Sequence, residues 1–200
     1  MRTLIVANIM SLDGYYEGPG GDVMALPMDH SFDAYNAERL ASADTLLLGR
    51  RSYEAFKSFW PQMADSPDAG TTHREIGLRQ NAMDKVVVSD GLTADQTRPW
   101  QDTTTIVRRG DAHEQVAAIK RSPGRDILVF GSRTLWNDLL AAGLVDEVHL
   151  MVGPVVLGGG TPAFGAVPGA PLRLQGVRRW EDSDNLVVRY ACGAAPGGRA

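Results

Sequence analysis

Residues 46–54 read LLLGRRSYE, which is a run of three leucines followed by a glycine, two arginines and a serine. A short, continuous apolar run is typical of a strand that is buried on both faces. Tyr53, Phe56 and Phe59 follow at a three-residue spacing, which predicts a helix over 52–59. The stretch therefore predicts a buried strand that turns directly into a helix, the repeating unit of layered α/β folds.

The same unit recurs along the chain. Residues 127–135, ILVFGSRTL, repeat the order of apolar run, small residues and helix start. The other apolar runs predict buried strands at 3–10, 45–48, 85–88, 103–107 and 126–130. Helical spacing predicts helices at 31–42 (with Ser31 as N-cap), 52–59, 112–121 and 132–142. This alternation predicts a layered α/β fold with a mainly parallel sheet.

The last third of the chain has a different pattern. Residues 145–152 alternate between apolar and polar residues, which is typical of a strand. Residues 172–180 and 185–191 also read as strands, and the acidic residues between them favour a turn. A terminal hairpin makes the sheet mixed. Residues 61–73 read as a surface loop.

Length and composition limit the possible organisation. The chain has 200 residues, of which 44% are hydrophobic and 22% charged, with neither a repeat nor a linker. These values predict a single domain over 1–192 and a flexible tail over 193–200. Glycine accounts for 22 of the 200 residues, which is more than the usual share of about 7%. Much of that excess follows the ends of expected strands.

Charge and residue types exclude several classes of partner. There are 20 basic and 24 acidic residues, so we expect no nucleic-acid partner. No apolar run reaches the ~18–20 residues that cross a bilayer, so we expect no membrane partner. The single Cys192 excludes a disulfide framework and fits a cytoplasmic location. The four histidines lack metal-ligand spacing, so we expect no metal.

Two strand-to-helix turns have the composition of a phosphate site. Free amides at a helix N-terminus attract phosphate, and arginines bind it with two hydrogen bonds. The first turn offers Gly49, Arg50, Arg51 and Ser52, and the second offers Gly131 and Ser132. Ordinary strand-end glycines beside surface arginines explain the first turn equally well. Two such turns at one sheet edge favour a nucleotide ligand.

Two glycine-rich loops, 11–22 and 153–162, follow expected strands. They are interpreted either as loops over a ligand or as plain turns, and for 153–162 the plain turn is favoured. Asp33, on the first helix, is a candidate to orient or protonate a substrate. Asp29, just before that helix, is explained as well by a helix-terminal charge.

Several short motifs follow one another in a characteristic order. They are Ser11-Leu12-Asp13-Gly14, Ala43-Asp44, Leu46–Arg50 with Tyr53-Glu54, Phe130-Gly131-Ser132, Leu144-Val145-Asp146-Glu147 and Gly153-Pro154-Val155-Val156-Leu157-Gly158-Gly159. Over about residues 2–190 the chain thereby resembles the dihydrofolate reductase-like superfamily. The branch it resembles is related to the reductase domain of riboflavin biosynthesis, the RibD C-terminal domain. The resemblance implies a three-layer α/β/α fold with a mixed, mostly parallel sheet of about eight strands.

The resemblance also implies NADPH as hydride donor, and it assigns residues to that cofactor. The implied cofactor-binding residues are Gly49, Arg50, Arg51, Ser52, Ser89, Gly131, Ser132, Arg133, Thr134 and Leu135. Asp13, Gly14, Gly158 and Gly159 match the loops over the substrate, and Asp33 lies near the place of a substrate-binding carboxylate in folate-reducing members. Relatives of the riboflavin type are commonly dimers, so we expect a homodimer, with the apolar 148–157 region as a possible interface.

The chain departs from the family pattern at informative positions. Its second turn reads Gly-Ser where Gly-Gly is usual, and Tyr15 and Tyr16 follow Asp13-Gly14 where the riboflavin branch usually has Lys. The two tyrosines and Trp60 either frame a flat substrate or pack the loop. We therefore expect an NADPH-dependent reductase of a small heterocyclic or carbonyl substrate. A true pyrimidine or dihydrofolate reductase, and a non-catalytic nucleotide-binding protein, remain the alternatives.

Overall fold

A computed structural model describes residues 1–165, 169 and 171–193, so most of the expected tail lies outside the described residues. Its strands are β1 (Leu4–Ser11), β2 (Tyr15–Glu17), β3 (Ala43–Gly49), β4 (Asp84–Val88), β5 (Thr104–Val107), β6 (Asp126–Phe130), β7 (Glu147–Gly153), β8 (Thr161–Pro162), β9 (Leu172–Trp180) and β10 (Ser183–Cys192). Its α-helices are α1 (His30–Ser42), α2 (Arg50–Asp65), α3 (Thr71–Ala82), α4 (Ala112–Arg121) and α5 (Arg133–Ala141).

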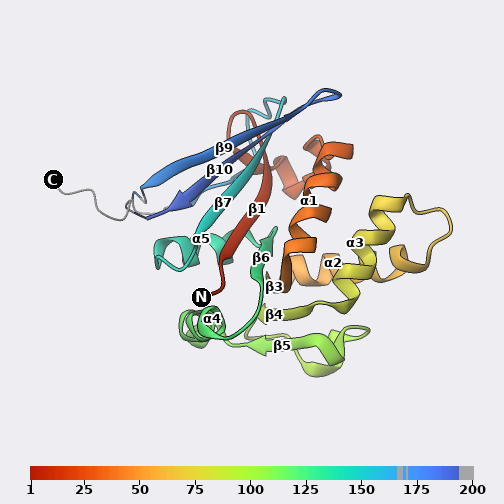
Figure 1. The fold of residues 1–200 in the computed structure, drawn as a ribbon, viewed down its shortest axis with the longest axis vertical. Coiled ribbons are helices and arrows are strands. Elements are labelled where there is room, and N and C mark those ends of the chain that lie inside the picture. The colour runs from red at the N-terminus through yellow and green to blue at the C-terminus, as the bar shows by residue number, and fades with distance from the viewer. Residues whose placement is uncertain (166–168, 170, 194–200) are drawn as a thin grey trace.

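The main sheet has eight strands in the order β5-β4-β3-β6-β1-β7-β10-β9. The six strands from β5 to β7 are parallel to one another, β10 pairs antiparallel with β7, and β9 pairs antiparallel with β10. A separate ladder joins β2 to β8. Helices cover both faces (Figure 1). The predicted mixed, mostly parallel α/β sheet and the terminal hairpin are thus confirmed.

The alternation of side chains along the central strands builds a core on each face. In β1, Leu4 and Val6 pack into the cluster that contains residues of α4 and α5, whereas Ile5 and Ala7 pack into the cluster under α1, α2 and α3. Burial on both faces explains why the strands read as continuous apolar runs. Among the described residues, no helix combines the length and apolar character needed to cross a membrane.

The predicted loop over 61–73 is wrong at both ends. Helix α2 continues to Asp65, and α3 begins at Thr71. The buried positions of α3 are Ile76, Gly77 and Gln80, while Leu78 is exposed. A buried face made of one apolar residue, a glycine and a glutamine leaves no hydrophobic stripe in the sequence, so periodicity does not reveal this helix.

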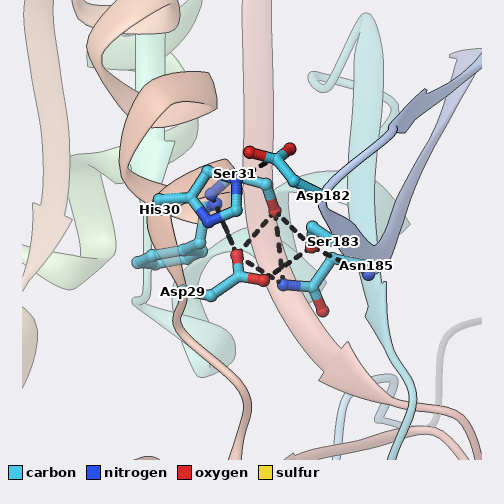
Figure 2. Close-up of polar contacts among 7 residues, drawn as sticks. Asp29, His30, Ser31, Asp182, Ser183 and Asn185 are labelled. Carbon is cyan, nitrogen blue, oxygen red and sulfur yellow. Dashed lines mark hydrogen bonds and ion pairs between the residues drawn. The ribbon is translucent and has the colours of Figure 1, made fainter.

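The sequence predicted Ser31 as the N-cap of α1, but the structure shows that Asp29 caps this helix. Figure 2 shows the Asp29 carboxylate at the centre of a group of donors. Its Oδ1 accepts hydrogen bonds from the Ser31 amide (2.9 Å), the Ser31 hydroxyl (2.6 Å) and Asn185 Nδ2 (2.9 Å). Its Oδ2 accepts one from the Ser183 hydroxyl (2.6 Å). The cap therefore also ties α1 to the start of β10.

These hydrogen bonds set the charge of Asp29. Partial burial alone would raise its pKa, but the hydrogen bonds from Ser183, Ser31, Phe32 and Asn185 prevail and lower the pKa to about 2. The carboxylate is therefore ionised throughout the physiological pH range, as an N-terminal cap favours.

The expected interface region over 148–157 is half buried: its β7 part lies inside the sheet, whereas Val156, beyond the end of β7, is 68% exposed. Strand β7 lies between β1 and β10, and Val148, Leu150 and Met151 are buried within the chain itself. Exposed apolar side chains also occur on β9, at Leu172, Leu174 and Val177. The homodimer, with the 148–157 region as its interface, stays a prediction.

We predict that Asp29→Ala lowers the free energy of unfolding at pH 7 by about 1–2 kcal/mol, because a helix cap is lost. A carboxylate whose pKa is depressed in the folded state stabilises above its unfolded pKa of about 4. The deficit of Asp29→Ala should therefore shrink as the pH falls from about 4 towards 2. Chemical denaturation of both proteins across this range measures it.

The matched control is Asp182→Asn, because Asp182 pairs with His30 on the surface at 3.0 Å and its side chain is 74% exposed. This variant should unfold within about 0.5 kcal/mol of the parent. A deficit of Asp29→Ala that stays constant from pH 7 to pH 2 would contradict the assignment.

Candidate functional site

A cleft of about 1030 Å³ opens at the carboxyl ends of the central strands. Its floor includes Asn8 of β1, Gly49 at the end of β3, Val88 at the end of β4 and Gly131 after β6. Helices α2 and α5 begin at this edge and lead to opposite faces of the sheet (Figure 1). Ligands of open α/β sheets bind at such a switch point.

Three polar side chains join the strand ends beneath the cleft. Asn8 continues the β1–β6 pairing, since its Oδ1 accepts from the Gly131 amide (2.6 Å) and its Nδ2 donates to the Gly131 carbonyl (3.2 Å). The Gly49 amide donates to Ser132 Oγ (3.0 Å), and the Ser132 amide donates to Ser52 Oγ (2.7 Å). The ends of β1, β3 and β6 are thereby fixed relative to one another.

The turn from β6 into α5 has an unusual backbone conformation. Gly131 and Ser132 both have positive φ, at 56° and 53°. A Cβ on Gly131 would lie 2.8 Å from Ser52 Oγ and 3.1 Å from the Tyr16 hydroxyl, so glycine is required there. Ser132 is the one non-glycine residue with positive φ in the described part of the chain. Ser132 adopts this left-handed conformation although it costs free energy, and in that conformation its hydroxyl oxygen accepts the hydrogen bond from the Gly49 amide.

Gly49 has a different environment. Its φ is −81°, and a Cβ there would meet just the Ser132 side chain, at 4.0 Å. The fold itself therefore does not require glycine at this position. The space above Gly49 belongs to the cleft, which is the observation expected if a ligand approaches the backbone there.

Four arginines line the cleft: Arg50, Arg51, Arg109 and Arg133. Arg50 donates to Glu54 (2.7 Å) and to the Gly91 carbonyl (2.9 Å), which ties the loop after β4 to α2. The Arg51 side chain is 75% exposed and lies 3.2 Å from Glu17. Arg50 and Arg51 begin α2, Arg133 begins α5, and Arg109 lies just before α4, so this part of the cleft favours anionic groups.

Nearly all of the expected cofactor residues meet at this cleft. Its lining includes Gly49, Arg50, Arg51, Ser52, Gly131, Ser132, Arg133, Thr134 and Leu135. Ser89 is absent from that lining; it is buried, and its hydroxyl accepts from the amides of Gly91 and Leu92. The structure gives Ser89 a turn-forming role, while its predicted contact to a cofactor stays a prediction.

The two glycine-rich loops do come together. Asp13 accepts hydrogen bonds from Ser11 (2.7 Å) and from the amides of Leu157 (3.0 Å) and Gly158 (2.8 Å). However, Asp13, Gly14, Gly158 and Gly159 do not belong to the described lining of the cleft.

The next residues of each loop form the β2–β8 ladder, and through it Tyr16, Glu17 and Thr161 reach the cleft. A Cβ at Gly160 would clash with the Glu17 carbonyl. The bare backbone of Gly160 therefore serves loop packing. Tyr15 does not line the cleft, so the two tyrosines do not jointly frame it.

Asp33 is not among the residues that line the cleft. Its Oδ2 lies 2.8 Å from Nε2 of His73, on α3, and the His73 ring packs edge-on against Trp60. Burial raises the pKa of Asp33, against the opposing effect of His73. The residues of α1 that do line the cleft are Phe32, Asn36 and Leu40. The predicted catalytic role of Asp33 stays a prediction, and in this structure the carboxylate joins α1 to α3.

Sequence reasoning missed the wall opposite the arginines. Phe32, Asn36, Phe59, Ile76 and Gln80 line it, together with Trp60, which was anticipated. Asn8 and Arg109 were also missed. A polar residue such as Asn8 inside an apolar strand is a usable signal, because a buried amide needs partners. Nothing in the local pattern marks Gln80, since it lies on the unrecognised α3.

We predict that Ser132→Ala lowers the free energy of unfolding by about 1–2 kcal/mol, because the hydroxyl bond to Gly49 is lost and the positive φ remains. Ser132→Gly loses the same bond but relieves a left-handed conformation that costs about 1–2 kcal/mol. It should therefore be close to the parent in urea denaturation. Equal destabilisation of both variants would show that the Ser132 backbone carries no strain.

Comparison with known proteins agrees with this architecture. A family model described as the RibD C-terminal domain matches residues 2–188. The uncharacterized protein YyaP of Bacillus subtilis (strain 168) is 33% identical over 163 residues, which are 82% of this chain and 80% of that protein.

Two solved structures share the fold. A diaminohydroxyphosphoribosylaminopyrimidine deaminase/5-amino-6-(5-phosphoribosylamino)uracil reductase from Thermotoga maritima superposes with a TM-score of 0.64 at 12% identity, covering 96% of this chain and 56% of that one. Dihydrofolate reductase from Enterococcus faecalis, complexed with NADP(H), gives 0.56 at 14% identity, covering 96% and 97%. The family match over nearly the whole chain settles the relationship: this protein is a member of the RibD C-terminal domain family.

Proposed function

We propose that the chain is an NADPH-dependent reductase that transfers a hydride to a small heterocyclic or carbonyl substrate. The observation that carries this proposal is the division of one cleft into two halves. One half has two helix N-termini and four arginines, and the other is apolar and aromatic. Such a cleft suits a phosphorylated dinucleotide and an uncharged ring placed end to end.

The residues of the first half fit the cofactor. The first turns of α2 and α5 direct amides towards the cleft, and the open space above Gly49 admits a phosphate close to the backbone. Ser52 Oγ accepts from Ser132, which leaves its own proton to donate to a ligand. Membership of this family and the NADP(H) complex of the similar dihydrofolate reductase support the same choice.

When bound, the cofactor supplies the hydride, and the protein supplies orientation and a dry environment. The half-buried side chains of Phe32 and Trp60 exclude water beside the reacting carbon. The polar side chains that α1 and α3 contribute to the cleft are Asn36 and Gln80, neither of which titrates, and the Tyr16 hydroxyl beside Gly131 has a pKa that burial raises above its ordinary value. We therefore propose that the proton reaches the substrate from water.

The dihydrofolate alternative is less well supported. Folate-reducing members use a carboxylate on the first helix to bind the pterin ring, whereas Asp33 is turned towards His73 here. A substrate recognised by neutral amides fits this wall better. A non-catalytic binding protein would keep the cofactor half of the cleft and oxidise no NADPH in the presence of any substrate.

We predict that the double variant Arg50→Ala/Arg51→Ala weakens NADPH about tenfold or more and changes NADH binding by less than about threefold. The reason is that a charge-assisted contact to the 2′-phosphate, which NADH lacks, is removed. Fluorescence titration of both nucleotides measures the two dissociation constants.

Arg79→Ala is the control, because Arg79 pairs with Glu75 as Arg50 pairs with Glu54 but lies outside the lining of the cleft. An equal loss of affinity for NADPH and NADH in the double variant would mean that neither arginine contacts the 2′-phosphate. Failure of the parent protein to bind either nucleotide below millimolar concentration would contradict the proposed function itself.

A further inference from the structure

The β2–β8 ladder is attached to the starts of two helices, α2 and α5. Glu17 of β2 and Thr161 of β8 line the cleft. Arg51, in the first turn of α2, pairs with Glu17. Arg133, the first residue of α5, donates a hydrogen bond to the Pro162 carbonyl of β8. The ladder is therefore a part of the cleft wall that an arginine holds at each side.

The attachment to α5 uses neutral partners. Arg133 donates to the carbonyl oxygens of Pro162 and Phe164, the second at 3.4 Å. Asn137, one turn further along α5, donates to the Ala163 carbonyl (3.1 Å). Within the described residues, Arg133 pairs with backbone carbonyls and with no carboxylate, so its charge is not neutralised.

The attachment to α2 is an ion pair with a buried carboxylate. The Glu17 side chain is 7% exposed, its Oε1 accepts from the Thr161 hydroxyl (2.8 Å), and its Oε2 lies 3.2 Å from Arg51 Nη2. In the described part of the chain, Arg51 is the one basic side chain that pairs with Glu17. A Cβ on Gly21 would lie 2.9 Å from the same Nη2, so the guanidinium also packs against the backbone of loop 11–22. Loss of Arg51 would leave a buried carboxylate without a counter-charge, which is strongly destabilising.

The neighbouring Arg50 is held less firmly. Its Nε donates to Glu54 (2.7 Å), and these two side chains are 41% and 45% exposed. Its other contact is to the neutral Gly91 carbonyl (2.9 Å). An exposed ion pair contributes little, and water solvates the carboxylate that is left when the pair opens. Arg50 can therefore turn towards an anion at a small cost, whereas Arg51 cannot leave Glu17.

We propose that the two neighbouring arginines have different roles. Arg51 and Glu17 are positioning residues that hold the β2–β8 ladder against the cleft, and Arg50 contacts the phosphate that distinguishes NADPH from NADH. Because Glu17 neutralises the charge of Arg51, a phosphate gains less from Arg51 than from Arg50. The role of Arg50 rests on the proposed function, while the role of Glu17 and Arg51 rests on the geometry of the chain alone.

Hydrogen exchange of the protein without nucleotide tests the attachment of the ladder. Arg51→Ala should raise the exchange rates of the amides in 15–22 about tenfold or more, because local opening of this segment becomes easier. The matched control Arg50→Ala should leave these rates within about twofold of the parent. Adding Glu17→Gln to Arg51→Ala should slow the exchange again, because the unpaired buried charge is then absent.

Fluorescence titration of the single variants tests the division between the two arginines. Arg50→Ala should weaken NADPH about tenfold or more relative to NADH, because the contact to the 2′-phosphate is lost. Arg51→Ala should change both dissociation constants by the same factor, because it acts through the position of the ladder.

The two experiments can each overturn the inference. Unchanged exchange of 15–22 in Arg51→Ala, or faster exchange after Glu17→Gln is added, would contradict the role of Glu17 and Arg51. Loss of the preference for NADPH in Arg51→Ala but not in Arg50→Ala would contradict the division. Parent protein that binds neither nucleotide would contradict the reductase proposal and with it the role of Arg50, and hydrogen exchange would still decide the role of Glu17 and Arg51.

Discussion

The hydrogen bonds of Asn8, Ser52 and Ser132 are the constraint on which the rest of the site depends. They satisfy the backbone groups of Gly131, Ser132 and Gly49 where the strand ladder stops. Each such bond contributes about 1 kcal/mol, and an unpaired buried amide would cost more. Because these groups are satisfied within the protein, the ends of three strands hold a fixed spacing. Helices α2 and α5 therefore begin at defined points beside the cleft.

The two halves of the cleft follow from this frame. The strand-to-helix turns bring cationic side chains and helix N-termini to one half. The other half is built by α1, α2 and α3, which Gly77, His73–Asp33 and the Asp29 cap hold together and against the sheet. Aromatic and aliphatic side chains of these helices line that half. The division of charge along one cleft is what connects this fold to reductase chemistry.

The sequence predicted the eight strands of the main sheet, because strands that are buried on both faces consist of short apolar runs. It also predicted four of the five α-helices in the described part of the chain. It also predicted both strand-to-helix turns. It failed at α3, whose buried face is Ile76, Gly77 and Gln80, since helix packing at a glycine has no hydrophobic signature. The role of Asp33 stays a prediction, and its contact with His73 could not be predicted, because residue spacing does not say which side of a helix another helix will cover.

A crystal structure of the chain with NADP⁺ is the most direct test of the account. Phosphates are expected at the first turns of α2 and α5, the 2′-phosphate against Arg50 or Arg51, and the nicotinamide beyond Gly131, facing Phe32 and Trp60. A dinucleotide bound elsewhere on the sheet, or one whose nicotinamide lies away from Phe32 and Trp60, would contradict the proposed function.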